Sequence, residues 1–119
     1  MYSIPFAVPS GPPRNLRASV TSSSSVYLTW DVPLPEYQNG IITNYTVLVT
    51  PVNLQRAAYQ LNSTNMSTQL LVSSLEEFSS YTFVVAAQTR VGIGPFSTSI
   101  TVQTTTDGKD IILSKQLKA

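Results

Sequence analysis

The stretch that decides the fold reads Leu75-Glu-Glu-Phe-Ser-Ser-Tyr81-Thr-Phe83-Val-Val85-Ala-Ala87. From Tyr81 onward, every second side chain is apolar or aromatic, which is the period of a β-strand with one buried face. Because Tyr81 starts this strand, its ring can enter the core while its hydroxyl bonds to nearby backbone. Leu75 closes an earlier apolar run. The pattern therefore predicts a corner that fixes a central strand to the connection before it.

Alternating segments lie on both sides of this stretch, separated by turn residues. They cover residues 16–20, 26–30, 42–49, 57–61, 68–72 and 100–104, the fourth as a short edge strand. Residues 90–96 are predicted to form a turn because they contain two glycines and a proline. Short strands with turns between them and no helical period predict an all-β fold, an antiparallel two-sheet sandwich. We expect Trp30, Tyr45, Leu70 and Phe83 to meet in its core.

The composition limits the chemistry that this chain can perform. Its 119 residues suit one domain with short tails, and its net charge is only +1. No basic face for nucleic acid and no polybasic membrane patch is expected. Cysteine and histidine are both absent, which excludes disulfides, Cys/His zinc sites and histidine-based catalytic triads. We therefore expect no cofactor, and we expect the isolated chain to be monomeric.

The two ends of the chain differ in composition from its middle. Residues 1–10 are predicted to be a linker, since prolines hold this part extended. The domain is placed at residues 11–105, and residues 106–119 are taken as a second linker or the start of a following segment. No apolar run is long enough to span a bilayer. The first residues lack the features of a signal peptide, so we expect a secreted parent to contain this chain as an excised piece.

Motifs in four separate segments resemble those of the fibronectin type III domain over about residues 10–105. They are Trp30-x-x-Pro33, Asn39-Gly40-x-Ile42-x-x-Tyr45-x-Val47, Leu75 followed by Tyr81-x-Phe83-x-Val85-x-Ala87, and Gly92-x-Gly94-Pro95-x-Ser97. The chain departs from the family at three positions. Glu77 and Ser79 stand where the family often has Pro and Thr, and Thr89 stands where Asn is frequent.

The resemblance implies an immunoglobulin-like sandwich of about seven strands with Trp30, Tyr45, Leu75, Tyr81 and Phe83 in its structural core. It further implies a non-catalytic extracellular module of a multidomain receptor or adhesion protein, which spaces neighbouring domains and binds proteins. The motifs are similar to those of neuronal adhesion molecules and receptor tyrosine phosphatases. Two alternatives remain open: an accessory domain of a modular enzyme, such as a receptor phosphatase or a carbohydrate-active enzyme, and an intracellular array of the muscle type.

Three Asn-x-Ser/Thr sequons begin at Asn44, Asn62 and Asn65. They predict N-glycosylation in a secreted parent. Chance would supply roughly one or two sequons in a chain with this content of asparagine, serine and threonine, so the excess is small. Asn44 is expected to point away from the buried face that contains Tyr45.

Two loops contain candidate contact residues. In the family, the turn at residues 90–96 often binds partners, which makes Arg90, Val91 and Ile93 candidates, and Tyr37 is a candidate aromatic in residues 34–38. The alternative is that the glycines of this turn serve backbone geometry alone. Glu76 and Glu77 are adjacent in sequence, so they are not expected to face each other across a substrate as a catalytic pair must.

Replacing Trp30 with alanine tests the predicted core. The substitution should lower the free energy of unfolding by about 3–5 kcal/mol, a large part of a total of about 5–15 kcal/mol. Urea denaturation of the variant and the parent chain would measure this loss. An unchanged denaturation midpoint for Trp30→Ala would contradict the predicted sandwich.

Overall fold

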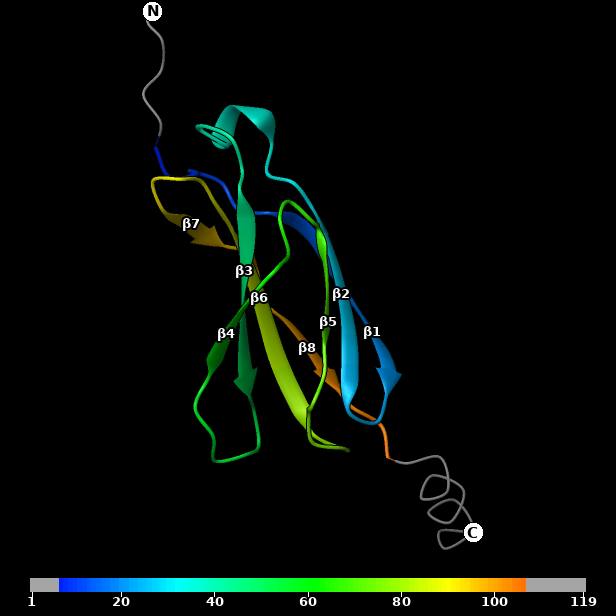
Figure 1. Ribbon diagram of the computed structural model, residues 1–119. Helices are drawn as coiled ribbons and strands as arrows, with labels where there is room; N and C mark the ends of the chain where they lie inside the picture. Colours follow the sequence, from blue (N-terminus) through cyan, green and yellow to red (C-terminus); the bar gives the residue numbers. More distant parts are fainter. Residues whose placement is uncertain (1–6, 107–119) are drawn as a thin grey trace, which may run out of the picture.

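The structure is a computed structural model that describes residues 7–106 as an all-β domain (Figure 1). Its elements are β1 (Arg14–Ser22), β2 (Ser25–Asp31), the 3-10 helix η1 (Pro35–Tyr37), β3 (Asn44–Pro51), β4 (Tyr59–Asn62), β5 (Gln69–Val72), β6 (Ser80–Gln88), β7 (Ile93–Phe96) and β8 (Ile100–Gln103). The predicted antiparallel sandwich is confirmed. Residues 1–6 of the predicted linker and residues 107–119 lie outside the described part.

The strands form two antiparallel sheets. One contains β1, β2 and β5 in that order, and the other contains β4, β3, β6 and β7, with β8 also paired to β6. β6 is the strand on which the second sheet is built, because it pairs with three others. Its ladder with β3 is continuous from Asn44 opposite Gln88 to Pro51 opposite Tyr81.

Side chains from both sheets meet in one core. The ring of Trp30 in β2 contacts the ring of Tyr45 in β3, with centroids 5.4 Å apart and an interplanar angle of 63°. This edge-to-face contact is a favoured arrangement of aromatic rings. Phe83 in β6 is fully buried in the same core, while Leu70 in β5 is only partly buried. The aromatic contact therefore joins the two layers.

The connection before β6 is held by hydrogen bonds to Tyr81 in β6 and to the β1–β2 turn. The hydroxyl oxygen of Tyr81 accepts a hydrogen bond from the backbone N–H of Glu76 at 2.8 Å, while the tyrosine ring is buried. The backbone N–H of Leu75 donates to the carbonyl of Ser24 in the β1–β2 turn. The corner at Tyr81 thus links the central strand of one sheet to a turn of the other.

The structure corrects the prediction for residues 90–96. Ile93–Phe96 forms strand β7, whereas the whole segment was predicted to be a turn. Pro95 is tolerated there because it lies in a short strand, at an irregularity between the Gln88–Ile93 and Ala86–Phe96 pairs. Ser97 then bonds to Val85 through both its backbone and its hydroxyl. Both β7 and β8 therefore pair with β6, and residues 7–106 contain eight strands.

The Tyr81 corner can be tested by removing one oxygen atom. Tyr81→Phe leaves the Glu76 N–H without its acceptor, so the free energy of unfolding should fall by about 1–2 kcal/mol. Chemical denaturation would measure the change. Tyr27→Phe is the matched control, because the Tyr27 hydroxyl bonds to Gln69 at the exposed surface, and it should cost less. Equal midpoints for the two variants would show that the corner adds no stability.

Candidate interaction surfaces

The first candidate surface is the end of the sandwich where the described chain begins, here called the loop pole (Figure 1). It consists of residues 7–11, the β2–β3 connection and the β6–β7 connection. The segment 7–11 lies between the two connections. The N–H of Ala7 donates to the carbonyl of Asn39, and the carbonyl of Ala7 accepts from the Thr89 hydroxyl at 2.7 Å. One residue of the segment thereby joins both connections.

Further contacts hold the segment in place. The side-chain amide of Asn39 donates to the carbonyl of Val8, and the N–H of Ser10 donates to the carbonyl of Tyr37 at 2.8 Å. Pro9 is fully buried. A Cβ atom on Gly94 would lie 2.6 Å from the carbonyl oxygen of Pro9. Gly94 therefore allows a close approach of two backbones, rather than the tight turn expected from the sequence.

The four candidate contact residues lie at this pole. Tyr37 is 45% exposed, Val91 is 53% exposed and Ile93 is 41% exposed, and Arg90 is also exposed. The structure adds Ile41, which at 69% exposure is the most open of these apolar side chains. Sequence reasoning missed Ile41 because the alternation shows only that one residue of the pair Ile41 and Ile42 is buried, and it does not show how exposed the other one is. The pole thus presents apolar side chains on loops whose backbones are fixed.

A cluster of charged groups lies where β2 ends. The carboxylate of Asp31 accepts a hydrogen bond from the Asn15 side chain at 2.7 Å and lies 3.7 Å from the Arg17 guanidinium. The Asn15 hydrogen bond, aided by Arg17 and Arg14, lowers the pKa of Asp31. Asn15 has a positive φ of 56° and stands at an irregularity in the β1–β2 ladder. The contacts of Asp31 with Asn15 and Arg17 therefore have a structural role, which is to hold β1 and β2 together at this irregularity.

The three sequons lie close together, around β3 and β4. Asn44 begins β3, Asn62 ends β4, and Asn65 lies in the following turn with a φ of 54°. Asn44 is two residues before Thr46, whose hydroxyl points away from the core and donates to Asn62. Asn44 therefore faces away from Tyr45 in this strand. Asn62 and Asn65 are exposed, whereas Asn44 is half-buried.

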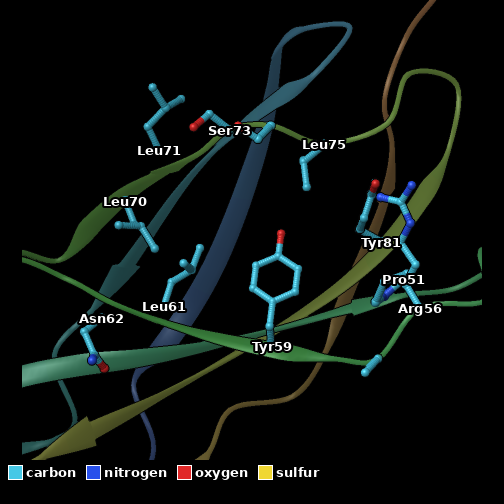
Figure 2. A pocket seen from close by; sticks show the side chains of 12 residues that line it. Pro51, Arg56, Tyr59, Leu61, Asn62, Leu70, Leu71, Ser73, Leu75 and Tyr81 are labelled. Atoms are coloured by element: carbon cyan, nitrogen blue, oxygen red, sulfur yellow. The ribbon is translucent and has the colours of Figure 1, made fainter.

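A second candidate surface is a hollow of about 510 Å³ between the edges of β4 and β5. Its apolar lining includes Tyr59, Leu61, Leu70, Leu71 and Leu75. Figure 2 shows the ring of Tyr59 directed into the hollow, with Leu61 beside it. Burial raises the pKa of the Tyr59 hydroxyl, and the neighbouring Tyr81 adds to this effect. The hollow lies on the side of the sandwich where β4 and β5, the edge strands of the two sheets, are not paired with each other. This side is here called the open side.

An ion pair crosses this open side. The guanidinium of Arg56, in the β3–β4 connection, lies 2.9 Å from the carboxylate of Glu76, in the β5–β6 connection. Both side chains are about half exposed, so the pair adds little stability. Among residues 7–106, no three His, Cys, Asp or Glu side chains gather where they could hold a metal ion. In the same part of the chain, no helix has the length and apolar character to cross a bilayer.

Comparison with known families resolves what kind of domain this is. The model of the fibronectin type III domain matches residues 11–103. The chain belongs to the fibronectin type III family. The predicted resemblance is thereby confirmed, and as a fibronectin type III domain this sandwich is a non-catalytic module.

Relatives of this fibronectin type III domain occur in receptor-type tyrosine-protein phosphatases and in cell adhesion molecules. It is 40% identical over 100 residues to receptor-type tyrosine-protein phosphatase F of Bos taurus. This match covers 84% of this chain and 5% of that protein. It is 35% identical over 105 residues to the cell adhesion molecule DSCAM of Rattus norvegicus, covering 85% of this chain and 5% of that protein. The chain thus spans about 5% of the length of these relatives.

A solved structure supports the same assignment. The FN5 domain of Drosophila Lar is 26% identical, with a TM-score of 0.69, and the match covers 83% of this chain and 99% of that one. The fibronectin type III domain described here therefore matches that single domain over almost its whole length.

Gly94→Ala tests whether residues 7–11 belong to the folded domain. The added methyl group would overlap the carbonyl of Pro9, so it should displace the segment and lower the free energy of unfolding by about 1–3 kcal/mol. Thermal or urea denaturation would measure the loss, with the exposed Ser99→Ala as a control near zero.

A truncation isolates the cause of this loss. In a chain without residues 1–10, Gly94→Ala should have almost no effect, because the overlapping carbonyl has been removed. The same destabilisation in both backgrounds would show that Pro9 is not responsible. The truncation also tests the predicted domain boundary at residue 11.

Proposed function

We propose that this chain is a non-catalytic extracellular module of a cell-surface receptor or adhesion protein, which spaces neighbouring domains and binds a protein partner through its loop pole. The observation that carries the proposal is that the chain matches one module, about 5%, of receptor-type phosphatases and DSCAM adhesion molecules. Binding of nucleic acid and direct contact with a membrane are not part of this function.

The path of the chain supports the spacer role. Residue 7 lies at the loop pole, and β8 leads to the opposite end of the sandwich (Figure 1). Domains before and after this one would therefore be held apart by the length of the sandwich. The core and the three ladders of β6 make such a spacer stiff.

The loop pole supports the binding role. Tyr37, Ile41, Val91 and Ile93 expose apolar surface there, and exposed apolar groups that gather in one place are typical of protein interaction sites. The hydrogen bonds of residues 7–10 fix the loops before any partner arrives. A partner would then lose less binding free energy to the ordering of these loops.

Two other assignments retain specific support. Relatives named as receptor phosphatases favour an accessory module of an enzyme, with all catalysis outside these residues. Domains A168–A170 of titin are 31% identical to this chain with a TM-score of 0.68, over 33% of that chain, which favours an intracellular array. Occupied sequons in a protein from its native source would separate an extracellular parent from an intracellular one.

Binding to intact cells tests the proposed surface. Fluorescent beads coated with the chain should bind cultured cells, and protease treatment of the cell surface should remove the binding. Tyr37→Ala and Val91→Ser should each weaken it about tenfold, the size expected for a contact residue at the centre of an interface. Denaturation midpoints of the variants would verify that both remain folded.

The control for this experiment is Gln103→Ala, which is exposed at the opposite end of the sandwich. It should bind like the parent chain. Equal loss of binding in all three variants, or binding that persists after protease treatment, would contradict a protein-binding loop pole.

A further inference from the structure

The open side of the sandwich has two unpaired sheet edges. β4 pairs only with β3, and β5 pairs only with β2. Neither strand contains a charged residue or a proline, since they read Tyr-Gln-Leu-Asn and Gln-Leu-Leu-Val. Tyr59 and Leu71 are 39% and 54% exposed on these two edges. An uncharged, apolar edge of this kind is a template for pairing with another chain.

Other edges of the two sheets carry features that hinder such pairing. β1 contains Arg14 and Arg17 and has two irregularities in its ladder. β7 contains Pro95 and has one irregularity. β8 lies close to β1 on the other side of the sandwich. The β3–β4 ladder is regular through all four of its pairs, so β4 needs protection of another kind.

Asn62 is placed to supply that protection. It is the last residue of β4, it is exposed, and it begins the sequon Asn62-Ser63-Thr64. Its side-chain oxygen accepts the Thr46 hydroxyl at 3.0 Å. The nitrogen of the amide takes no part in this bond. A sugar can therefore be attached to this nitrogen without loss of the hydrogen bond.

The attachment point is also rigid. The next residue, Ser63, is buried, and its hydroxyl oxygen accepts the N–H of Tyr45 while its own N–H donates to the Tyr45 carbonyl. Figure 2 shows the amide of Asn62 pointing away from Leu70 of the facing edge. Asn62 borders the hollow, but since its amide points away from Leu70, a sugar attached there would extend along the outside of β4.

The other two sequons lack this combination. Asn44 is in β3, which has a neighbouring strand on each side, and the Thr46 of its sequon is buried. Asn65 lies beyond the strand, in the turn closed by the bond from the Ser67 N–H to the Thr64 carbonyl. Only Asn62, among the three, is an exposed residue on an unpaired edge.

We propose that carbohydrate linked to Asn62 covers the unpaired edge of β4 and prevents a second copy of this chain from pairing there. The inference rests on the proposed extracellular function, because N-linked carbohydrate is added in the secretory pathway. Four residues of strand span about 13 Å, so a bulky, well-hydrated glycan at one end can overlie the whole edge.

The test compares matched chains that are secreted from a eukaryotic host. Thr64→Ala removes the Asn62 sequon but keeps Asn62 and its bond to Thr46. Ser67→Ala removes the Asn65 sequon in the same way. Mass spectrometry of the peptides gives the occupancy of each site, and sedimentation velocity gives the state of association over a range of concentrations.

The parent chain and Ser67→Ala should carry carbohydrate on Asn62 and remain monomeric. Thr64→Ala should self-associate at a protein concentration at least about tenfold lower than any at which the parent chain associates. Adding Gln60→Lys to Thr64→Ala should restore the monomer, because a charge on the edge opposes strand pairing.

Four results would overturn the inference. Thr64→Ala could remain as monomeric as the parent chain, or its association could persist with Gln60→Lys. Carbohydrate on Asn44 or Asn65 but not on Asn62 would overturn the inference while leaving the extracellular placement supported. Carbohydrate on none of the three would overturn the inference and also count against the extracellular placement, without bearing on binding by the loop pole.

Discussion

The contact between the rings of Trp30 and Tyr45 is the interaction on which the rest of the structure depends. It joins the two sheets near the end of β2 and the start of β3, in a chain that has no cysteine with which to form a disulfide. The contact also carries a cost. Within the described residues, the buried indole N–H of Trp30 has no hydrogen-bond partner, which costs about 1–3 kcal/mol. Burial of the large ring area must offset this cost, so close packing around Trp30 is a requirement of the fold.

A core built in this way leaves the ends of the sandwich free for other roles. At one end, residues 7–11 bond to both neighbouring connections and turn two loops into one surface. At the open side, the sheets diverge around Tyr59 and leave two edges unpaired. We propose that the first feature serves binding of a partner and that the second would allow unwanted pairing. A fibronectin type III module that binds a partner through its loops has to permit the first and prevent the second.

Sequence reasoning located most strands and the Tyr81 corner, because both depend on side chains that are near one another in the chain. It failed for β7, where glycine and proline indicated a turn although Ser97 and Val85 hold the segment beside β6. The close approach of Gly94 to Pro9 was also missed, since the two residues are far apart in sequence. Ile41 was missed because the alternation of apolar residues identifies the buried face of a strand, but it does not show which residue of a loop remains exposed.

The sequence by itself determined the class of fold, the buried faces of the main strands and the family, because period-two alternation and the spacing of aromatic and turn residues are local properties of the chain. Only the tertiary structure decided that residues 7–11 join two loops, that Thr46 anchors Asn62, and that β4 and β5 are left unpaired. Each of these depends on which distant segments become neighbours when the two sheets pack. That outcome follows from the whole core rather than from any one segment.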